Sequence, residues 1–336
     1  MELREVVFTL SEAFGASGSE SSAAMTACVM LRNWCPDARI ESGNVIGTFG
    51  EKREGLPSLV LDAHIDQVGF IVTSITDEGF IKFDQLGGID RRLVPAQPVI
   101  IHGKRDVPGV ICSVPPHLSN GADVVKYEDT AIDTGLTRGE LAETVSPGDP
   151  VTFDVKCRQL LGERITGAAL DDRCGVASIL YALELIKDRK PRYNVTVIFS
   201  GQEEVSERGA KIGAFQLDPD IAIAVDVSFA MAPGENDKKC GKLGKGPMIG
   251  ISPSLSREIT DGLIETAKLK EIPYQLEVMN GLTSTNADRY SVNRCGCKAC
   301  TVSVPLRNMH TPVEVIDLED VRLTAQLLAD YITEGE

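Results

Sequence analysis

The sequence predicts an α/β protein in which a domain built on a mixed sheet, with helices on both faces, is interrupted by a small inserted β-rich domain. Three observations predict this organisation. Helix-type and strand-type segments alternate after Gly167, which is the order typical of α/β domains. Residues 68–153 instead carry short alternating apolar runs between clusters of Gly, Pro and Asp. The chain has 336 residues, of which 43% are hydrophobic, so it is long for one domain and can bury a substantial core.

The first part of the chain contributes two helices and one buried strand. Residues 1–14 and 19–34 place apolar side chains at helical spacing behind starts rich in Ser or Glu, which predicts helices. The apolar run SLVLDA at residues 58–63 predicts a buried strand that ends at His64. This strand has to belong to the same sheet as the later strands if His64 is to meet the carboxylates that follow them.

The inserted domain is predicted from a change of pattern. Turn-forming segments rich in Gly, Pro and Asp, such as GGIDRRLVPAQP and SPGDP, separate short strand-type runs there, and long helical patterns are missing. We therefore assign residues 1–67 and 154–336 to one discontinuous domain and residues 68–153 to the insertion.

The alternation of helix and strand resumes in the last part of the chain. Each apolar strand-type run there is followed by a segment with apolar residues at helical spacing, which favours a sheet covered on both faces. The expected helices are 174–187, 206–215, 256–270 and 318–332, and the expected strands are 193–199, 221–227 and 274–278.

Composition and charge exclude several classes of protein. The net charge of −15 argues against nucleic acid as the main partner, because phosphate binding requires a basic surface. No stretch approaches the roughly 18 apolar residues of a membrane helix, and the first residues lack the apolar core of a signal peptide. The nine cysteines are an odd, scattered set that fits a reducing compartment better than a disulfide framework. We expect a cytoplasmic protein without a nucleic-acid or membrane partner.

Polar side chains gather where the predicted strands end. His64 follows one strand, the adjacent Glu203 and Glu204 follow the next, and Asp226 ends a third. Because sites in open α/β sheets form outside the carboxyl ends of the strands, these groups are expected at one edge. A set of imidazole and carboxylates without cysteine suits zinc, cobalt or manganese rather than calcium. Asp171 or Asp172 could supply the carboxylate that bridges two such ions.

Two of these patterns also have plainer explanations. A lone Glu-Glu pair is usually an acidic turn at the surface. Only the other polar clusters at strand ends support a functional role for this pair. His64 and Asp66 have the spacing at which a carboxylate holds the ring nitrogen opposite a metal. An ordinary structural histidine accounts for that spacing about equally well.

Five motifs in order carry a resemblance to a known family. Read together, AHIDQVGF, GAALDDRCG, SGQEEVSERGA, AVDVS and MHTPVE resemble the cytosolic dinuclear-metal aminopeptidases that build tetrahedral (TET) shells. The stretches PPHL and KLGKGP extend the resemblance over nearly the whole chain. The family includes glutamyl and leucyl aminopeptidases, and some members carry an endoglucanase name. It implies an α/β peptidase domain interrupted by a β-barrel-like dimerisation domain, and a homo-oligomer between a dimer and a dodecamer.

The resemblance also implies roles for individual residues. Glu203 would be the general base that takes a proton from the water and returns it to the leaving amine, with Asp66 supporting the site. Asp172 would stand behind the ligands, and the Asp-Asp bond is often cis in such enzymes. The ligands of the two divalent ions, zinc or cobalt or else manganese, would be His64, Asp171 and Asp226 for one and Asp171, Glu204 and His310 for the other, with Asp171 shared.

The chain departs from the family pattern at three places. Gln67 stands where the family often has Glu, Ser206 and Glu207 replace a usual Gly-Leu pair, and Asn286 stands where relatives have Asp. All six core positions are intact, so we expect metal binding and catalysis. The departures concern the substrate preference or the level of activity.

Three functions follow from the sequence. The first is a metal-dependent aminopeptidase that acts on short peptides. The second is a glycoside hydrolase, which requires two carboxylates about 5–10 Å apart across a sugar, whereas Glu203 and Glu204 are adjacent and diverge. The third is a catalytically altered assembly protein, suggested by Asn286. The spacing of Cys295, Cys297 and Cys300 resembles a thiolate cluster, but we expect these side chains to be packing residues.

Overall fold

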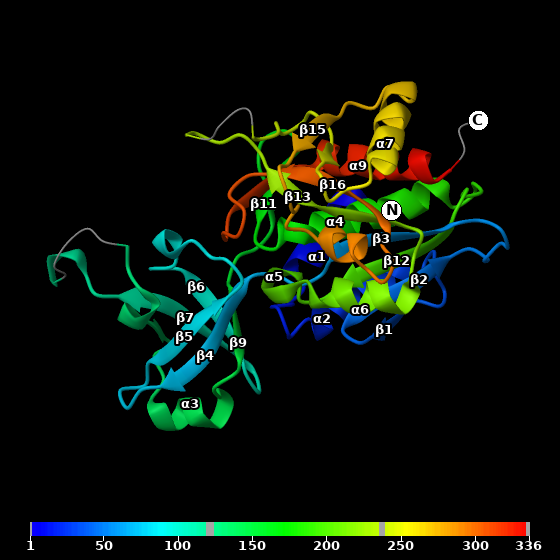
Figure 1. Ribbon diagram of the computed structural model, residues 1–336. Coiled ribbons are helices and arrows are strands. Elements are labelled where there is room, and N and C mark those ends of the chain that lie inside the picture. Colours follow the sequence, from blue (N-terminus) through cyan, green and yellow to red (C-terminus); the bar gives the residue numbers. More distant parts are fainter. Residues whose placement is uncertain (1, 119–123, 235–238, 334–336) are drawn as a thin grey trace.

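The computed structural model describes residues 2–118, 124–234 and 239–333. It contains a large α/β unit and a smaller β-barrel that projects from one side of it (Figure 1). The barrel is formed by the middle of the sequence, and the α/β unit by the segments before and after it. The predicted α/β fold with an inserted β-rich barrel is confirmed. The domain boundaries at residues 67 and 154 stay a prediction.

The α/β unit is built on a mixed sheet of eight strands. Four neighbouring strands, β12, β3, β13 and β16, run parallel to one another, whereas β2 and β14 flank them antiparallel. The carboxyl ends of the four parallel strands therefore meet at one edge. In spatial order the strands are β1 (Arg39–Glu41), β2 (Asn44–Phe49), β12 (Asn194–Ser200), β3 (Ser58–His64), β13 (Ile221–Phe229), β16 (Lys298–Leu306), β14 (Met248–Ile251) and β15 (Gln275–Val278).

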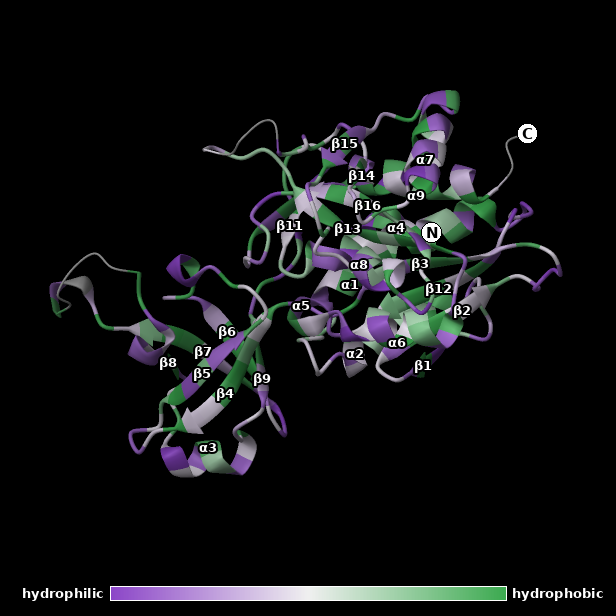
Figure 2. Ribbon diagram, in the orientation of Figure 1, coloured by the Kyte–Doolittle hydropathy of each residue, from purple (hydrophilic) through white to green (hydrophobic). Residues whose placement is uncertain are grey.

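Helices cover both faces of this sheet. The larger core lies between one face and five helices: α1 (Leu3–Glu12), α2 (Ser21–Leu31), α4 (Leu170–Ile186), α7 (Arg257–Leu269) and α9 (Leu318–Ile332). A smaller core on the other face is closed by α6 (Arg208–Leu217) and α8 (Ala287–Ser291). Figure 2 shows the result as apolar strands inside and a hydrophilic outer side on α7. This is the division expected when two-sided burial drives the packing.

The side chains of the sheet alternate between these two cores. On β3, Leu59 and Leu61 face the larger core and Val60 faces the smaller one. His64 lies four residues after Val60, and Asp226 lies two residues after Ala224, so each points to the same side of the sheet as that residue of the smaller core. Both polar residues therefore extend the α6/α8 face at the carboxyl edge, where the helices leave room.

The inserted segment forms a closed barrel. The barrel order is β4 (Gly69–Ile75), β5 (Ile81–Leu86), β8 (Thr130–Asp133), β7 (Asp106–Ser113), β6 (Pro98–His102) and β9 (Pro150–Phe153). Its core is apolar, and Phe70 meets Phe83 and Phe153 edge-on at centroid distances of 5.0 and 5.3 Å. The helix α3 (Arg138–Thr144) begins with a capping box at Thr137 and Glu140. The described part of the segment also contains short 3-10 turns: η1 (Arg91–Leu93), η2 (Pro116–Leu118) and η3 (Tyr127–Asp129).

Several predicted elements need correction. The helix expected at 206–215 is α6 and begins two residues later, because Glu207, with a left-handed φ of 51°, separates α6 from a short preceding helix, α5 (Glu203–Ser206). Five elements of the α/β unit were not predicted, because they are short or begin in polar sequence: β1, β2, β14, β16 and α8. A small antiparallel sheet was not predicted either; it consists of β10 (Arg158–Gln159), β11 (Arg164–Gly167) and β17 (Glu314–Asp317). None of the helices in the described ranges is long and apolar enough to cross a membrane.

The barrel and the α/β unit touch through an aromatic stack. The His102 ring of β6 lies on the Phe14 ring, with centroids 3.7 Å apart. The two His102 ring nitrogens are each 2.9 Å from a partner, Asp106 Oδ1 and Thr152 Oγ1. A neutral imidazole satisfies both partners, since one nitrogen donates to the carboxylate and the other accepts from the hydroxyl.

Candidate metal centre

The structure brings the polar strand ends together at the carboxyl edge of the parallel strands. His64 is the last residue of β3, Glu203 and Glu204 open α5 directly after β12, and Asp226 lies near the end of β13. Asp171 comes from the start of α4, where its backbone and that of Asp172 are not yet helical. The peptide bond between these two residues is cis, as the family resemblance implies.

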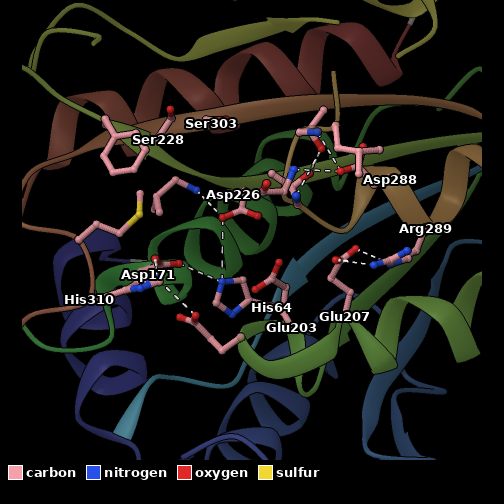
Figure 3. A pocket seen from close by; sticks show the side chains of 18 of the residues that line it. His64, Asp171, Glu203, Glu207, Asp226, Ser228, Asp288, Arg289, Ser303 and His310 are labelled. Carbon is pink, nitrogen blue, oxygen red and sulfur yellow. Dashed lines mark hydrogen bonds and ion pairs between the residues drawn. The ribbon is translucent and has the colours of Figure 1, made fainter. Parts of the chain in front are cut away.

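These side chains form two groups with the spacing of metal ligands. His64, Asp171 and Asp226 make one group, and Asp171, Glu204 and His310 make the other, with the ligand atoms of each group all within 4.8 Å of one another. The sequence-based assignment names the same two sets. Asp171 belongs to both groups and offers a different oxygen to each histidine. Its Oδ1 is 2.9 Å from His64 Nε2, and its Oδ2 is 3.3 Å from His310 Nε2 (Figure 3).

His64 is oriented by the chain that follows it. Its Nδ1 lies 3.1 Å from the main-chain oxygen of Asp66 and 3.6 Å from the carboxylate oxygen Oδ1. A hydrogen bond to this carbonyl makes Nδ1 the donor and leaves Nε2 as the free ligand atom that faces Asp171. The carboxylate of Asp66, which the spacing suggested as the partner, is the more distant group.

The carboxylate of Asp66 instead fixes the two glutamates. Its Oδ1 accepts the main-chain N–H of Glu203 at 2.9 Å, and its Oδ2 accepts that of Glu204 at 3.2 Å and the Ser17 hydroxyl. The buried Asp66 carboxylate thus accepts the free N–H groups at the start of the short helix α5, as the side chain of an N-cap residue does. Asp66 is fully buried and acts on the site through these neighbours.

Two further buried carboxylates hold the ligand backbone. Asp172 Oδ2 accepts the main-chain N–H of His64 at 3.3 Å, which places it behind the ligands as the resemblance implies. Glu314 accepts the main-chain N–H of Asp171 at 3.2 Å through Oε2 and that of His310 at 2.9 Å through Oε1. Glu314 therefore ties two ligand segments together. Glu314 was not predicted as a site residue, although it closes the MHTPVE motif four residues after His310.

The barrel also contributes to the centre. His310 Nδ1 donates to the main-chain oxygen of Gly88 at 2.6 Å, and Gly88 belongs to the inserted segment after β5. This hydrogen bond fixes the tautomer that leaves Nε2 facing Asp171 and Glu204, with the Glu204 oxygen at 3.3 Å. One predicted ligand is thus oriented by a domain to which it does not belong.

The crowding of charge shifts the pKa values in the centre. Burial raises the pKa of Glu203 to about 7, with His64 opposing the rise and Asp66 and Asp171 adding to it. Burial also raises the pKa of Glu204 and Asp226 well above the usual range, reinforced by the charge of Asp171. Burial lowers the pKa of His310, but Asp171 and Glu204 outweigh it and the pKa stands at about 10. The centre therefore holds more negative charge than two imidazoles offset, which is the electrostatic setting that bound cations stabilise.

The donor set fits divalent cations. Each group offers one imidazole nitrogen and two carboxylate oxygens, and neither group contains a thiolate. Such sets suit zinc, cobalt and manganese. A shared carboxylate with its two oxygens turned to different sides is also what a bridged pair of ions requires. The residues present therefore fit two ions.

Several residues around the centre adopt left-handed backbone conformations. Ala169, Gln202, Glu207 and His310 have φ values between 51° and 59°. For residues other than glycine, this region costs on the order of 1 kcal/mol and persists where the surroundings enforce it. All four flank or belong to the ligand-bearing segments, so the surroundings of the site hold its backbone in place.

A cavity of about 550 Å³ opens beside the ligands. Its wall includes Ser206 and Glu207, the positions that depart from the family. Glu207 forms a two-point ion pair with Arg289 of α8, at 2.9 Å between Oε1 and Nη2 and 2.7 Å between Oε2 and Nε (Figure 3). The departures therefore shape the wall of the cavity.

The other departures lie away from the ligand groups. Asn286 is buried and donates to the Ser200 hydroxyl at 2.7 Å, which in turn donates to Asp62. Gln67 is buried and joins the Gly15–Ser17 segment through its main-chain N–H and oxygen. Neither belongs to a group of potential metal ligands in the described ranges.

The cysteine motif does not form a metal site in the described part of the chain. Cys295 is exposed, Cys297 is partly exposed and Cys300 is buried in β16, and no group of potential metal ligands includes any of them. They also form no disulfide with one another.

Comparison with known proteins identifies relatives over nearly the whole chain. A family profile for M42 glutamyl aminopeptidase matches residues 43–327. The lysyl aminopeptidase of Pyrococcus furiosus is 29% identical over 339 residues, covering 98% of this chain and 96% of the relative. Among solved structures, an aminopeptidase from the archaeon Desulfurococcus kamchatkensis has a TM-score of 0.93 and 31% identity, covering 99% of this chain and 95% of that one. The TET1 peptidase of Pyrococcus horikoshii, described as assembling into a tetrahedron or a large octahedral shell, has a TM-score of 0.87 and 30% identity, with 99% and 100% covered.

Proposed function

This chain belongs to the M42 glutamyl aminopeptidase family, and from that premise we propose that it removes N-terminal residues from short peptides with Glu203 as the general base. Family membership makes the chain a metal-dependent aminopeptidase, a hydrolase of the exopeptidase class. The observation that carries the finer proposal is the pair of ligand groups that share Asp171, with Glu203 beside them on the cavity wall.

We propose that two divalent ions bind at the two ligand groups. His64, Asp171 and Asp226 would hold one ion, and Asp171, Glu204 and His310 the other. When bound, such ions supply Lewis acidity, which lowers the pKa of a water molecule and polarises a peptide carbonyl. Zinc or cobalt suits the donor set best, and manganese is compatible with it.

Glu203 is suited to moving the proton. It lines the cavity next to His64, while Glu204 belongs to a ligand group, so the two neighbouring carboxylates have separate tasks. Burial raises the pKa of Glu203 to about 7, which allows its carboxylate to take a proton near neutral pH and to release it again. In the proposed reaction Glu203 takes the proton of the attacking water and gives it to the nitrogen of the leaving amine, so the proton balance closes.

Asp66 and the barrel position the reacting groups. Asp66 fixes the main-chain N–H groups of Glu203 and Glu204, and the Gly88 carbonyl fixes the ring of His310. Small displacements of such groups lower rates strongly, because the chemistry depends on alignment. We assign both as positioning groups that do not touch the substrate.

The alternative functions have weaker support. Glu204 belongs to a ligand group and Glu203 lines the cavity beside it, so the two carboxylates have separate tasks and do not form the pair that flanks a sugar in a glycoside hydrolase. A catalytically altered assembly protein was suggested by Asn286, but this amide lies in a buried network outside both ligand groups. Both alternatives enter the experiment as possible outcomes.

The experiment compares wild type with Glu203→Gln after reconstitution with zinc or cobalt. Substrates are a panel of aminoacyl-p-nitroanilides, with carboxymethylcellulose as the sugar polymer. We expect the wild type to hydrolyse at least one anilide, and Glu203→Gln to lower kcat by about 10²–10⁴-fold, the usual contribution of a general base. Elemental analysis should find bound metal in both proteins.

The matched control is Glu51→Gln, the same change at an exposed carboxylate. Unchanged activity in Glu203→Gln would remove Glu203 as the base. Absence of metal after reconstitution would contradict the ligand assignment, and activity on the sugar polymer alone would favour the glycoside hydrolase.

We also propose that the chain forms a homo-oligomer, between a dimer and a dodecamer, through the inserted domain of residues 68–153, and that it acts in the cytoplasm. The assembly of similar TET peptidases supports the oligomer. Sedimentation velocity of the purified chain tests it, and a monomer at micromolar concentration would contradict it.

A further inference from the structure

A carboxylate that the proposed mechanism does not use lies in the wall of the catalytic cavity. Glu277 of β15 lines the same cavity as Glu203 and the ligands. It accepts hydrogen bonds from two hydroxyls that also line the cavity, Ser228 of β13 and Ser303 of β16, the latter at 3.1 Å. The side chain thus reaches from the edge strand of the sheet to the strands that carry the metal centre.

The sheet places these three residues beside the predicted ligands. Ser228 follows Asp226 by two residues and so extends from the same face of β13. Ser303 is the neighbour of Asp226 across the parallel pair of β13 and β16. Figure 3 shows Ser228 and Ser303 next to each other on the Asp226 side of the cavity, away from the Glu207–Arg289 pair.

A glycine opens the way between Glu277 and these serines. Gly250 of β14 is the register partner of Glu277, and its face of the strand is crowded, since a Cβ there would lie 2.2 Å from Thr301 Oγ1. Because Gly250 carries no side chain, nothing from that position stands between Glu277 and β16. The carboxylate can therefore cross the β14 strand at this point.

Glu277 has hydroxyl partners but no cationic one in the described ranges. Among the described residues, Glu277 forms no ion pair, including none with Lys239, which borders a neighbouring cavity together with Glu277. Arg289, an arginine of the cavity wall, is held at two points by Glu207. Burial raises the pKa of Glu277, against the two serine hydrogen bonds. A half-buried carboxylate in this setting is stabilised by a cation from outside the chain.

Asp288, another acidic group of this wall, has its hydrogen-bond partners within the chain. Asp288 accepts the main-chain N–H groups of Thr283 and Ser284 at 2.8 and 2.9 Å through a single oxygen, and its other oxygen accepts from Ser254. Its role is to fold the 283–288 loop. Glu277 is thus the carboxylate of the cavity wall that is left to meet a substrate.

We propose that Glu277, with Ser228 and Ser303, receives the ammonium or guanidinium group of a lysine or arginine at the N-terminus of the substrate. This inference rests on the proposed aminopeptidase function. A substrate whose N-terminal residue sits at the metal centre would extend its side chain along the cavity toward this carboxylate. The same arrangement disfavours an N-terminal Glu or Asp, because Arg289, the arginine of the wall in the described part of the chain, is neutralised by Glu207.

The experiment measures kcat/KM of the metal-loaded full-length protein on four p-nitroanilides: lysyl, arginyl, norleucyl and glutamyl. Norleucine has the carbon chain of lysine without its ammonium group, so the ratio of kcat/KM for the lysyl and norleucyl substrates measures the effect of that charged group. A charged hydrogen bond contributes enough for a ratio of about 10 to 100 in the wild type. We expect Glu277→Gln to bring this ratio close to 1 and to raise the glutamyl rate relative to the lysyl rate. The matched control, Glu265→Gln at an exposed carboxylate of α7, should keep the wild-type ratio.

Inhibition by the free amino acids gives a readout that does not depend on turnover of a chosen substrate. L-lysine should inhibit wild type at a concentration lower than L-norleucine by a similar factor, and Glu277→Gln should abolish the difference. Glu277→Lys should reverse the preference toward glutamyl substrate.

The outcomes separate this inference from the proposed function. A wild-type enzyme that cleaves norleucyl or leucyl anilide as well as lysyl anilide overturns the role of Glu277, while the aminopeptidase function stands. This comparison uses the wild-type protein alone, so it does not depend on whether a variant folds. A selectivity for lysine that survives Glu277→Gln also overturns it. A metal-loaded wild type that cleaves no anilide at all contradicts the proposed function itself.

Discussion

The barrel core and the carboxyl edge of the large sheet are built on opposite principles. The barrel is held by an apolar cluster in which Phe70, Phe83 and Phe153 pack edge-on, and its core contains no predicted functional group. The sheet edge buries His64, Asp66, Asp171, Asp172 and Asp226, most of them carboxylates close to one another. Buried charges of one sign destabilise a fold unless hydrogen bonds and counter-charges offset them.

The difference shows where structure and function depend on each other. In the barrel, the buried core is apolar, and the Gly88 main-chain oxygen forms a hydrogen bond to a predicted ligand, His310. At the sheet edge, main-chain N–H groups donated to Asp66, Asp172 and Glu314 hold the acidic groups in place. Cations would complete the neutralisation. The two regions should therefore respond differently to the same perturbation.

Removal of divalent metal should produce the largest effect and should be confined to the sheet edge. We expect a chelator to lower kcat/KM by at least about a thousandfold, since metal ions supply several kcal/mol of transition-state stabilisation. Hydrogen exchange should accelerate in the segments around residues 64–66, 170–172 and 203–207, because their carboxylates lose the counter-charge. The barrel strands should keep their exchange rates.

Readdition of zinc or cobalt should restore both the activity and the protection from exchange. Equal acceleration in the barrel strands would show that the two regions are not independent. Full activity in demonstrably metal-free protein would contradict the proposed function.

Loss of barrel packing should produce the second effect, in the other region. Phe70→Ala should destabilise the barrel by about 3–5 kcal/mol, the usual cost of removing a fully buried phenylalanine. Hydrogen exchange measured strand by strand should locate the loss in β4–β9, while the metal content stays at the wild-type level.

The control Phe215→Ala removes a side chain that is 64% exposed and rests under the Arg294 guanidinium. It should cost about 1 kcal/mol or less. A Phe70→Ala protein that loses its metal would reveal that the barrel stabilises the centre by more than the Gly88 contact.

The smallest expected effect concerns the contact between the two regions. Burial lowers the pKa of His102, against the opposing influence of Asp106, so the folded protein takes up this proton less readily than the unfolded chain. The contribution of His102 to the free energy of unfolding is therefore full above the pKa of about 6.5 that histidine has in the unfolded chain. It is lost as the pH falls from there toward the lower pKa of His102 in the folded protein. Thermal unfolding of wild type should show this loss between pH 7 and 5, and His102→Gln should show less of it.

The control is His117→Gln, an exposed histidine of the same inserted segment, which should keep the wild-type pH dependence. The prediction fails if His102→Gln and wild type lose stability in parallel over this range.

Helices and strands were predictable where a segment is long enough to show a clear hydrophobic periodicity. The helix expected at 318–332 has the bounds of α9, and the strand expected at 221–227 lies within β13. Short strands such as β1 and β14 were missed because three or four residues carry no clear periodicity, and pairing with neighbours makes them strands. The helix predicted at 206–215 begins only at Arg208, because Glu207 has a left-handed backbone conformation that interrupts the helix.

The sequence by itself determined the inventory of the centre: the histidines and carboxylates stand at strand ends, and that placement is local information. The tertiary structure alone decided their partners. It turned the Asp66 carboxylate to the main-chain N–H groups of the glutamates, brought the Gly88 carbonyl to His310, and carried Glu277 to the Ser228 and Ser303 hydroxyls. These contacts join segments far apart in the chain, and they depend on which strands become neighbours. That choice comes from burial over the whole molecule, and a local pattern does not contain it.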